Sequence, residues 1–353
     1  MTREALKKPG KGVKFLKQKK STVTVGLDIG SYSIKYVEIS QDKEAITLRQ
    51  AKVLPLSTQS SESLKASLQT LTPPPGPSAR VRVSVSGQSL LIRRIKLPLM
   101  TRNDLKGAIH YEAESHIPFP VHDCILDFQI LNQVANEKMM NVLLVAAKRD
   151  FIQERLKILE EARWRPELID VDIFCLANAF EKLNQQEESK VYGLLNIGHQ
   201  SSSFAIIHDK IPHFMREIPI GGVCVTNALA EAKSVPDEDA DKQKKSRLPE
   251  QLPELQAATQ KGFEPLIEEL KHSIDYFENE VGEDLPSIFL SGGGAMSVGA
   301  VEFLSQELEK KVTLWDNTKK MEISKEITPK FIEEHALEFN VAFGVSLRGL
   351  GSK

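Results

Sequence analysis

A carboxylate, a glycine, two hydroxyl side chains and a lysine lie close together near the start of the sequence. They are Asp28, Gly30, Ser31, Ser33 and Lys35, in the stretch VGLDIGSYSIKYVEIS. The simpler interpretation is a turn in which the aspartate hydrogen-bonds to backbone two residues on. The alternative is a phosphate cradle, in which the glycine admits an anion to backbone N–H groups, the serines add donors and the lysine adds charge. Asp28 would then hold a hydrated Mg²⁺ through its waters. Short glycine motifs are common by chance, so this stretch alone leaves both interpretations open.

Three consecutive glycines are the second feature that suggests chemistry. Gly292, Gly293 and Gly294 follow the apolar run SIFLS and precede AVEFLSQEL, which has the pattern of an amphipathic helix. Backbone N–H groups are unpaired at a helix N-terminus, so a strand that feeds a glycine turn at this point suits a phosphate or a ribose. A tight turn needs only one glycine. Three therefore indicate close approach by a bound group.

The elements that must position these residues repeat along the chain. Residues 22–29 and 34–39 have the pattern of a β-hairpin. The strand VYGLLNIG begins a similar hairpin about 170 residues later, again with a turn of small residues. This spacing predicts a duplicated two-lobe architecture, because the repeats of a solenoid are much shorter.

Other segments give local predictions. Thr101 and Asp104 form a capping box, which predicts a helix that runs to about His116. Residues 233–262 are polar and interrupted by prolines, so we expect an insertion or a connecting segment there. A long helix is expected over residues 263–281, whose apolar side chains fall on one face.

The composition is that of an ordinary globular protein. The chain has 353 residues, 41% of them hydrophobic and 27% charged, with a formal net charge of −2. This is long enough for two domains, and the charge gives no indication of nucleic-acid binding. Cys124, Cys175 and Cys224 lie far apart without metal-ligand spacing, which predicts buried thiols in a reducing compartment. No apolar run reaches the length of a membrane span and no signal core precedes the first strand, so we expect a cytosolic protein.

The first 20 residues are an exception to this balance, with eight basic side chains against one acid. A solvated, flexible arm explains this composition. Contact with a membrane surface is the alternative, because each Lys or Arg near anionic lipid contributes about 1 kcal/mol.

Taken in order, three motifs resemble those of the actin-like ATPase superfamily, which also contains sugar kinases and heat-shock chaperone ATPases. GLDIGSYSIK is similar to the first phosphate loop, LLNIGHQSSSFAII to the second, and IFLSGGGAMS to the adenosine loop. Within the superfamily, residues 23–349 resemble the PilM family of type IV pilus assembly. That resemblance rests further on SVSGQSLLIRRIKLPLM, AIHYEAESHIPFPVHDCILDFQIL, NVLLVAAKRDFI, FMREIPIGG and NVAFGVSLRG.

The resemblance implies an α/β, actin-like (ribonuclease H-like) fold with two lobes and an inserted 1C subdomain. The implied divisions are a basic flexible arm (1–21), subdomain 1A (22–87 and 166–190), subdomain 1C (88–165), subdomain 2A (191–225 and 284–353) and subdomain 2B (226–283).

The resemblance also implies that ATP and Mg²⁺ bind in the cleft between the lobes. On one side, the phosphates and the metal's waters would meet Asp28, Gly30, Ser31, Ser33 and Lys35. On the other side, they would meet Gly198, Ser201, Ser202 and Ser203. The ribose and base would lie near Gly292, Gly293, Gly294, Ala295 and Met296, with Glu268 and Lys271 on the preceding helix.

One position departs from the family pattern. Asn196 stands where the second loop usually has an acid, and an amide has no charge and cannot act as a base. Its presence should weaken metal binding and the positioning of an attacking water, unless Asp170 or Asp172 substitutes. We therefore expect bound nucleotide to act as a clamp between the lobes, with weak or absent ATP hydrolysis.

The implied function is a cytoplasmic ATP-binding scaffold of a type IV pilus or related type II secretion platform. It would dock the N-terminal tail of a PilN-like inner-membrane protein, and so lie at the inner membrane through that partner. Main-chain hydrogen bonds and side-chain pockets would capture the extended tail. The residues expected to border this groove are Ile92, Ile95, Leu97, Ile117 and Phe119.

Two alternatives remain from the sequence. An FtsA-like filament former shares the 1C subdomain and would self-associate, although FtsA-like chains usually end in an amphipathic helix and this sequence ends in RGLGSK. A kinase of the superfamily would need a further catalytic acid beside a substrate pocket, and we find no convincing one. The sequence does not distinguish a pilus role from a secretion role.

Overall fold

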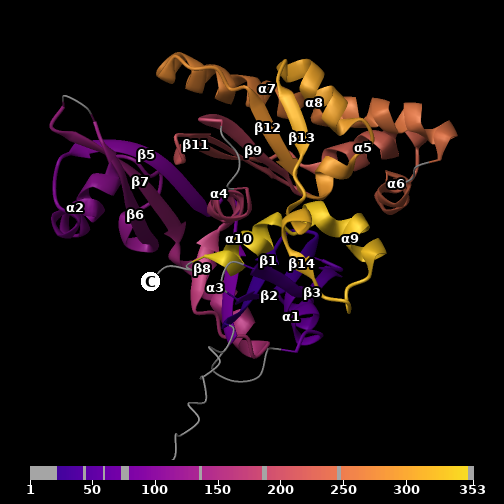
Figure 1. Ribbon diagram of the computed structural model, residues 1–353, viewed down its shortest axis with the longest axis horizontal. Helices are drawn as coiled ribbons and strands as arrows, with labels where there is room; N and C mark the ends of the chain where they lie inside the picture. The colour runs from indigo at the N-terminus through magenta and orange to yellow at the C-terminus, as the bar shows by residue number, and fades with distance from the viewer. Residues whose placement is uncertain are drawn as a thin grey trace, which may run out of the picture.

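The computed structural model describes residues 22–42, 45–58, 60–72, 79–134, 137–184, 189–244 and 248–348. It has two lobes, each built on its own sheet, and a smaller third sheet that projects from the side (Figure 1). The predicted basic arm, residues 1–21, lies outside the described residues.

The first lobe is built on a six-stranded sheet in the order β14-β3-β2-β1-β4-β8. Its strands are β1 (Thr22–Ile29), β2 (Ser33–Asp42), β3 (Ala45–Pro55), β4 (Ala79–Val85), β8 (Leu168–Val171) and β14 (Glu322–Ile323). Strands β1, β2 and β3 form an antiparallel meander, whereas β4 is parallel to β1 and β8 is parallel to β4. Helices α1 (Ser61–Gln69) and α3 (Arg149–Glu161) pack on one face of this sheet.

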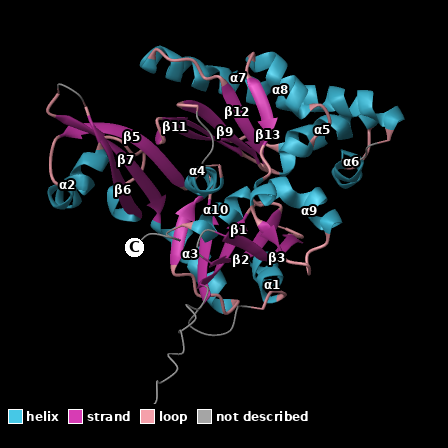
Figure 2. Ribbon diagram, viewed as in Figure 1, coloured by secondary structure: helices cyan, strands magenta, loops and turns pink. Residues whose placement is uncertain are grey.

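The second lobe repeats this arrangement. Its five-stranded sheet has the order β11-β10-β9-β12-β13. The strands are β9 (Val191–Ile197), β10 (Ser202–His208), β11 (Ile211–Ile218), β12 (Ser287–Ser291) and β13 (Lys311–Leu314). Three antiparallel strands are again followed by two parallel ones, which confirms the predicted duplication. Helices α5 (Gly222–Lys233), α7 (Leu252–Val281) and α8 (Ala300–Leu308) cover its outer face (Figure 2).

Two helices join the lobes. Helices α4 (Asp172–Leu183) and α10 (Asn340–Leu347) lie between the two sheets (Figure 1). Residues of α4 and α10 pack on the second sheet, and residues of α10 also pack on β2 and β3 of the first. The remaining short helix near this junction, α9 (Pro329–His335), packs Phe331 against Phe339.

The third sheet has three strands and its own core. Its order is β5-β7-β6, formed by β5 (Leu90–Pro98), β6 (Cys124–Gln133) and β7 (Met139–Lys148). Helix α2 (Arg102–Glu114) covers it and begins at the predicted capping box of Thr101 and Asp104. Helix α3, which the predicted 1C boundaries include, instead packs Ile158 and Leu159 into the core of the first lobe.

The prediction of a polar connecting segment over residues 233–262 is wrong in part. The structure has helix α6 (Asp237–Lys244) there, and α7 begins at Leu252 rather than near residue 263. Small apolar residues explain the difference, because Ala240, Leu255 and Ala258 are buried in the core of the second lobe. The apolar positions in this segment are too few, among many charged residues, to give the periodicity by which a helix is recognised in a sequence.

Two further predictions concern the whole chain. The three cysteines are free, with Cys124 and Cys175 buried and Cys224 half-buried. Among the described residues, no helix has both the length and the apolar character that a bilayer crossing requires.

Candidate nucleotide site and adjoining cavity

The first candidate loop is the turn between β1 and β2. Asp28 lies opposite Lys35 in the hairpin register, and its Oδ2 is 3.7 Å from the lysine Nζ. The Gly30 N–H donates to the Ser33 carbonyl oxygen at 3.2 Å, which closes the turn. Both Asp28 and Ser33 are buried. A carboxylate, an ammonium group and a tight glycine turn are thus held together by a rigid hairpin.

The second loop and the adenosine loop meet at three glycines. The Gly222 N–H, at the start of α5, donates to the Gly198 carbonyl oxygen at 2.9 Å. A side chain on Gly222 would lie 3.3 Å from Gly294 Cα and 3.4 Å from the Gly198 carbonyl oxygen. Gly198, Gly222 and Gly294 therefore approach one another closely, although they come from three separate parts of the sequence. The sequence motifs identified two of them and missed Gly222.

Tyr32 connects the first loop to the second lobe. Its hydroxyl donates to Asp241 Oδ2 on α6 at 2.9 Å, and its ring centroid lies 4.7 Å from that of His199. Partial burial and this hydrogen bond raise the pKa of Tyr32 to about 12, so the phenol stays protonated. Asp241 also pairs with Lys244 at 2.8 Å. The first loop therefore lies beside the second lobe through Tyr32, and the second loop lies beside the adenosine loop. The junction of these three loops between the lobes is called the cleft below.

The structure also shows different surroundings for the two acids that could substitute for Asn196. Asp170 forms an ion pair with Arg348 and accepts from the Val171 N–H, so it has a structural role. Asp172, the first residue of α4, is buried, and its Oδ1 has no hydrogen-bond partner among the described residues. Asn196 itself accepts a hydrogen bond from the Ser291 hydroxyl at 3.1 Å. Asp172 is thus the acid that remains available to a ligand.

The two buried carboxylates of this cleft influence each other. Burial raises the pKa of Asp28, whereas the Lys35 ammonium opposes that rise. Burial and the charge of Asp28 raise the pKa of Asp172 to about 8, with hydroxyl groups of Ser86 and Ser84 acting in the opposite direction. The cleft therefore holds one carboxylate beside a lysine and a second that is protonated near neutral pH.

This arrangement predicts a pH-dependent stability. The pKa of Asp172 rises from 3.8 to about 8 on folding, so the folded state keeps a proton that the unfolded state loses between those values. The free energy of unfolding should therefore fall as pH rises from 4 to 8, by up to about 1.4 kcal/mol per pH unit, and level off above 8. Asp172→Asn should flatten this fall and raise the melting temperature at pH 8. Thermal unfolding of the nucleotide-free protein at several pH values measures this pH dependence. An unchanged slope of stability against pH in Asp172→Asn would show that Asp172 is not its source.

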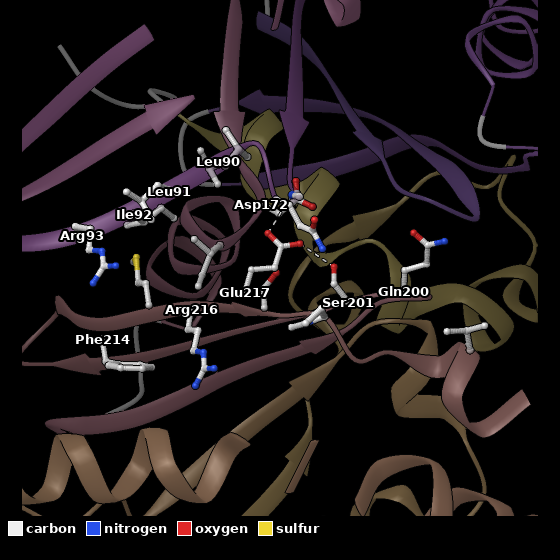
Figure 3. Close-up of a pocket in the computed structure, with 18 residues that line it drawn as sticks. Leu90, Leu91, Ile92, Arg93, Asp172, Gln200, Ser201, Phe214, Arg216 and Glu217 are labelled. Carbon is white, nitrogen blue, oxygen red and sulfur yellow. Dashed lines mark hydrogen bonds between the residues drawn. The ribbon is translucent and has the colours of Figure 1, made fainter. Parts of the chain in front are cut away.

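An open cavity of about 800 Å³ adjoins the cleft. One end is formed by Asp172 and Ser201, and the rest lies between β5 and β11 (Figure 3). Both of these strands are edge strands of their sheets, so each has backbone groups that no neighbouring strand in its own sheet pairs. The apolar part of the lining comes from Leu90, Leu91, Ile92, Phe214 and Met215.

Most of the predicted groove residues are not in this cavity. Ile95, Leu97 and Ile117 are buried in the core of the three-stranded sheet, and Phe119 packs against that core. These four residues therefore lie in or against the core of the subdomain and outside this cavity, and the prediction that they border the groove for the tail stays a prediction. Ile92 alone lines the cavity, since strand alternation places it on the face opposite Ile95 and Leu97.

The two predicted contacts on α7 also lie away from the loops. Lys271 pairs with Glu307 of α8 at 3.4 Å, and Glu268 is exposed. The first turns of α7 approach the segment that follows the adenosine loop, where Gln256 would be 3.0 Å from a side chain on Gly299 at the start of α8. Lys271 is fifteen residues further along, or about 22 Å at the rise of an α-helix.

Comparison with known families decides the family. The model of type IV pilus assembly protein PilM matches residues 26–350. The chain belongs to the PilM family. The predicted resemblance to PilM is thus confirmed over almost the whole described chain.

Solved structures agree on the fold. A PilM–PilN type IV pilus biogenesis complex matches with a TM-score of 0.81 and 23% identity, covering 93% of this chain and 98% of that chain. MreB5 of Spiroplasma citri bound to AMPPNP matches with a TM-score of 0.53 and 10% identity, covering 94% and 97%. The ethanolamine utilization protein EutJ from Carboxydothermus hydrogenoformans matches with a TM-score of 0.50 and 15% identity, covering 93% and 90%. The predicted α/β, actin-like fold is therefore confirmed.

Proposed function

We propose that this PilM-family protein is an adenine-nucleotide-binding scaffold of type IV pilus assembly that docks the extended N-terminal tail of a PilN-like membrane partner. The observation that carries this proposal is the meeting of three glycine loops, from β1–β2, β9–β10 and β12, at one cleft between the lobes. A continuous cavity then leads from that cleft to two edge strands.

Nucleotide binding is supported by the chemistry of the cleft. Lys35 supplies positive charge, and small-residue turns leave backbone N–H groups accessible to phosphate oxygens. A solved relative of the same fold, MreB5, was determined with AMPPNP bound. We place the phosphates between the loops of Gly30 and Gly198, and the ribose and base against Gly293.

The same cleft fits a hydrated Mg²⁺. The Asp28 carboxylate supplies hard oxygen donors, which this ion prefers. Among the described residues no cluster of three or more His, Cys, Asp or Glu could enclose a metal ion, so the phosphates and waters would complete its coordination. When bound, Mg²⁺ would neutralise phosphate charge.

Hydrolysis is expected to be slow. Asn196 lacks the charge and basicity of the usual acid, and its side-chain oxygen is engaged by Ser291. Asp172 is the nearest candidate base, but a carboxyl with a pKa of about 8 is largely protonated at neutral pH. Bound nucleotide would then hold the two lobes together and seldom be converted to product.

Tail docking is supported by the cavity between β5 and β11. An extended peptide can form main-chain hydrogen bonds with exposed strand edges while its side chains fill apolar pockets. The related solved structure is a complex of PilM with PilN. The location at the inner membrane would follow from that partner.

Binding and turnover should be measured separately. Calorimetry with Mg-ATP should give a saturable heat of binding, whereas phosphate release should stay near the background rate. A pull-down with the tail of the PilN-like partner, against a tail-deleted partner as control, tests docking. Absence of ATP binding, or equal recovery of both partner forms, would overturn the corresponding half of the proposal.

The cavity predicts a specific docking variant. Ile92→Glu would place a charge in the apolar part of the lining, so we expect tail affinity to fall at least tenfold, or about 1.4 kcal/mol. ATP affinity should not change. Leu99→Glu is the matched control, because Leu99 is 48% exposed in the same subdomain and does not line the cavity. Fluorescence anisotropy with a labelled tail measures both, and equal affinities in the two variants would contradict the placement of the tail.

A further inference from the structure

One carboxylate contacts both the second phosphate loop and the start of the 1C subdomain. Glu217, on β11, accepts a hydrogen bond from the Ser201 hydroxyl through Oε1 at 2.7 Å. Its Oε2 accepts from the Gly87 N–H at 3.0 Å. In Figure 3 the Glu217 side chain lies between Asp172 and Ser201, at the end of the cavity nearest the phosphate loops.

Gly87 marks the point where the chain leaves the first lobe. It follows β4 and precedes β5, and its φ of +120° is one that side-chain-bearing residues rarely adopt. The Leu90 N–H donates to the Gly87 carbonyl oxygen at 3.0 Å, so the same residue forms the turn into β5. A group that holds the Gly87 N–H therefore fixes the direction in which β5 and its sheet leave the lobe.

Among the described residues, the Glu217 carboxylate has no positively charged partner. It accepts hydrogen bonds from the Ser201 hydroxyl and the Gly87 N–H and forms no ion pair with any of those residues. Its negative charge is near enough to Asp172 to raise the pKa of that carboxyl. A polyphosphate bound at the Ser201 loop would therefore both compete for the serine hydroxyl and repel this carboxylate.

We propose that Glu217 couples nucleotide occupancy to the position of the 1C subdomain. This inference rests on the proposed function and deepens it. Without nucleotide, Glu217 bridges Ser201 and Gly87 and holds β5 against the second lobe. With nucleotide, the Ser201 hydroxyl turns to a phosphate oxygen, the carboxylate moves away from the added charge, and the Gly87 N–H is released. The β5 edge, and with it one wall of the cavity, then changes position, so nucleotide alters tail affinity. Glu217 acts here as a positioning residue.

The test variant is Glu217→Gln, which keeps shape and can keep both contacts. The amide oxygen can accept from the Gly87 N–H and the amide nitrogen can donate to Ser201, so only the charge is lost. Arg94→Ala is the matched control. Arg94 contacts His213 and lies 3.6 Å from Glu280, so it also holds β5 to the second lobe, but it does not contact the phosphate loop.

Three measurements are made on each full-length protein, with and without Mg-AMPPNP: calorimetry, hydrogen exchange over residues 86–92, and affinity for the partner's tail. We expect nucleotide to speed exchange in that segment and to change tail affinity at least fivefold in the wild type, within the usual range of coupling between sites. Arg94→Ala should retain this response. Glu217→Gln should still bind Mg-AMPPNP, with less than a twofold change in tail affinity and no change in exchange.

The outcomes distinguish failure of the proposed nucleotide site from failure of the coupling through Glu217. No binding of Mg-AMPPNP to the wild type would overturn the proposed nucleotide site and the coupling with it. Binding without a change in exchange at residues 86–92 would overturn the coupling alone. A full response in Glu217→Gln would show that another group transmits occupancy.

Discussion

Gly293→Ala should lower the affinity for Mg-ATP by roughly ten- to a hundredfold, or about 1.4–2.7 kcal/mol, without lowering the melting temperature. The fold alone does not require a glycine at this position. Gly293 is exposed, and an added side-chain carbon would meet Glu338 at 3.8 Å, an ordinary van der Waals distance. Its φ is not positive either. A nucleotide bound as proposed against this turn would give a physical reason for a glycine here.

The neighbouring glycine provides the control. In Gly294→Ala the added carbon would lie 2.3 Å from Ile197 Cγ2 and 3.0 Å from the Ile197 carbonyl oxygen, so this variant should lose stability whether or not nucleotide binds. Calorimetry and thermal unfolding of both variants separate the two effects. If Gly293→Ala binds Mg-ATP as tightly as the wild type, the nucleotide does not approach the turn and the proposed site is misplaced.

The sequence predicted the parts of the site that local pattern determines. Apolar strands that end in glycine are recognisable without knowledge of their neighbours, and so are the order and spacing of the three loops. The capping box of Thr101 and Asp104 is equally local. The duplicated two-lobe architecture followed from the recurrence of the hairpin, and the matching strand orders of the two sheets confirm it.

The residues that the sequence missed or misplaced depend on long-range packing. The sequence named Asp172 only together with Asp170 as a substitute for Asn196, and the structure distinguishes them because β8 leads Asp172 to a place near Asp28, which lies far away along the chain. Gly222 meets Gly294 only when α5 packs against the adenosine loop. By contrast, the alternation of β5 already separates Ile92 from Ile95 and Leu97, so that period-2 pattern could have shown that these three residues do not share one face of the strand.

The largest stability effect is expected at the junction of the lobes, in Gly344→Ala. Gly344 lies on α10, where a side-chain carbon would be 1.7 Å from the Cys175 carbonyl oxygen and 2.3 Å from the Cys175 carbonyl carbon on α4. Both obstacles are backbone atoms, so no side-chain rearrangement relieves them and the two helices must separate. Overpacking of this kind costs typically 1–3 kcal/mol, and we expect a value of about 3 kcal/mol or more.

Separation of α4 from α10 should also weaken nucleotide binding, because these helices set the distance between the two sheets and Asp172 is the first residue of α4. Gly107→Ala is the matched control. Gly107 lies within α2, and an added carbon there would meet nothing within 4 Å. An alanine at that position should be neutral or should raise stability by up to about 1 kcal/mol through helix propensity. Urea unfolding of both variants, with and without Mg-ATP, measures these effects. Equal midpoints for the two variants would show that the contact between α4 and α10 can relax, and that the two lobes are not held at a fixed separation.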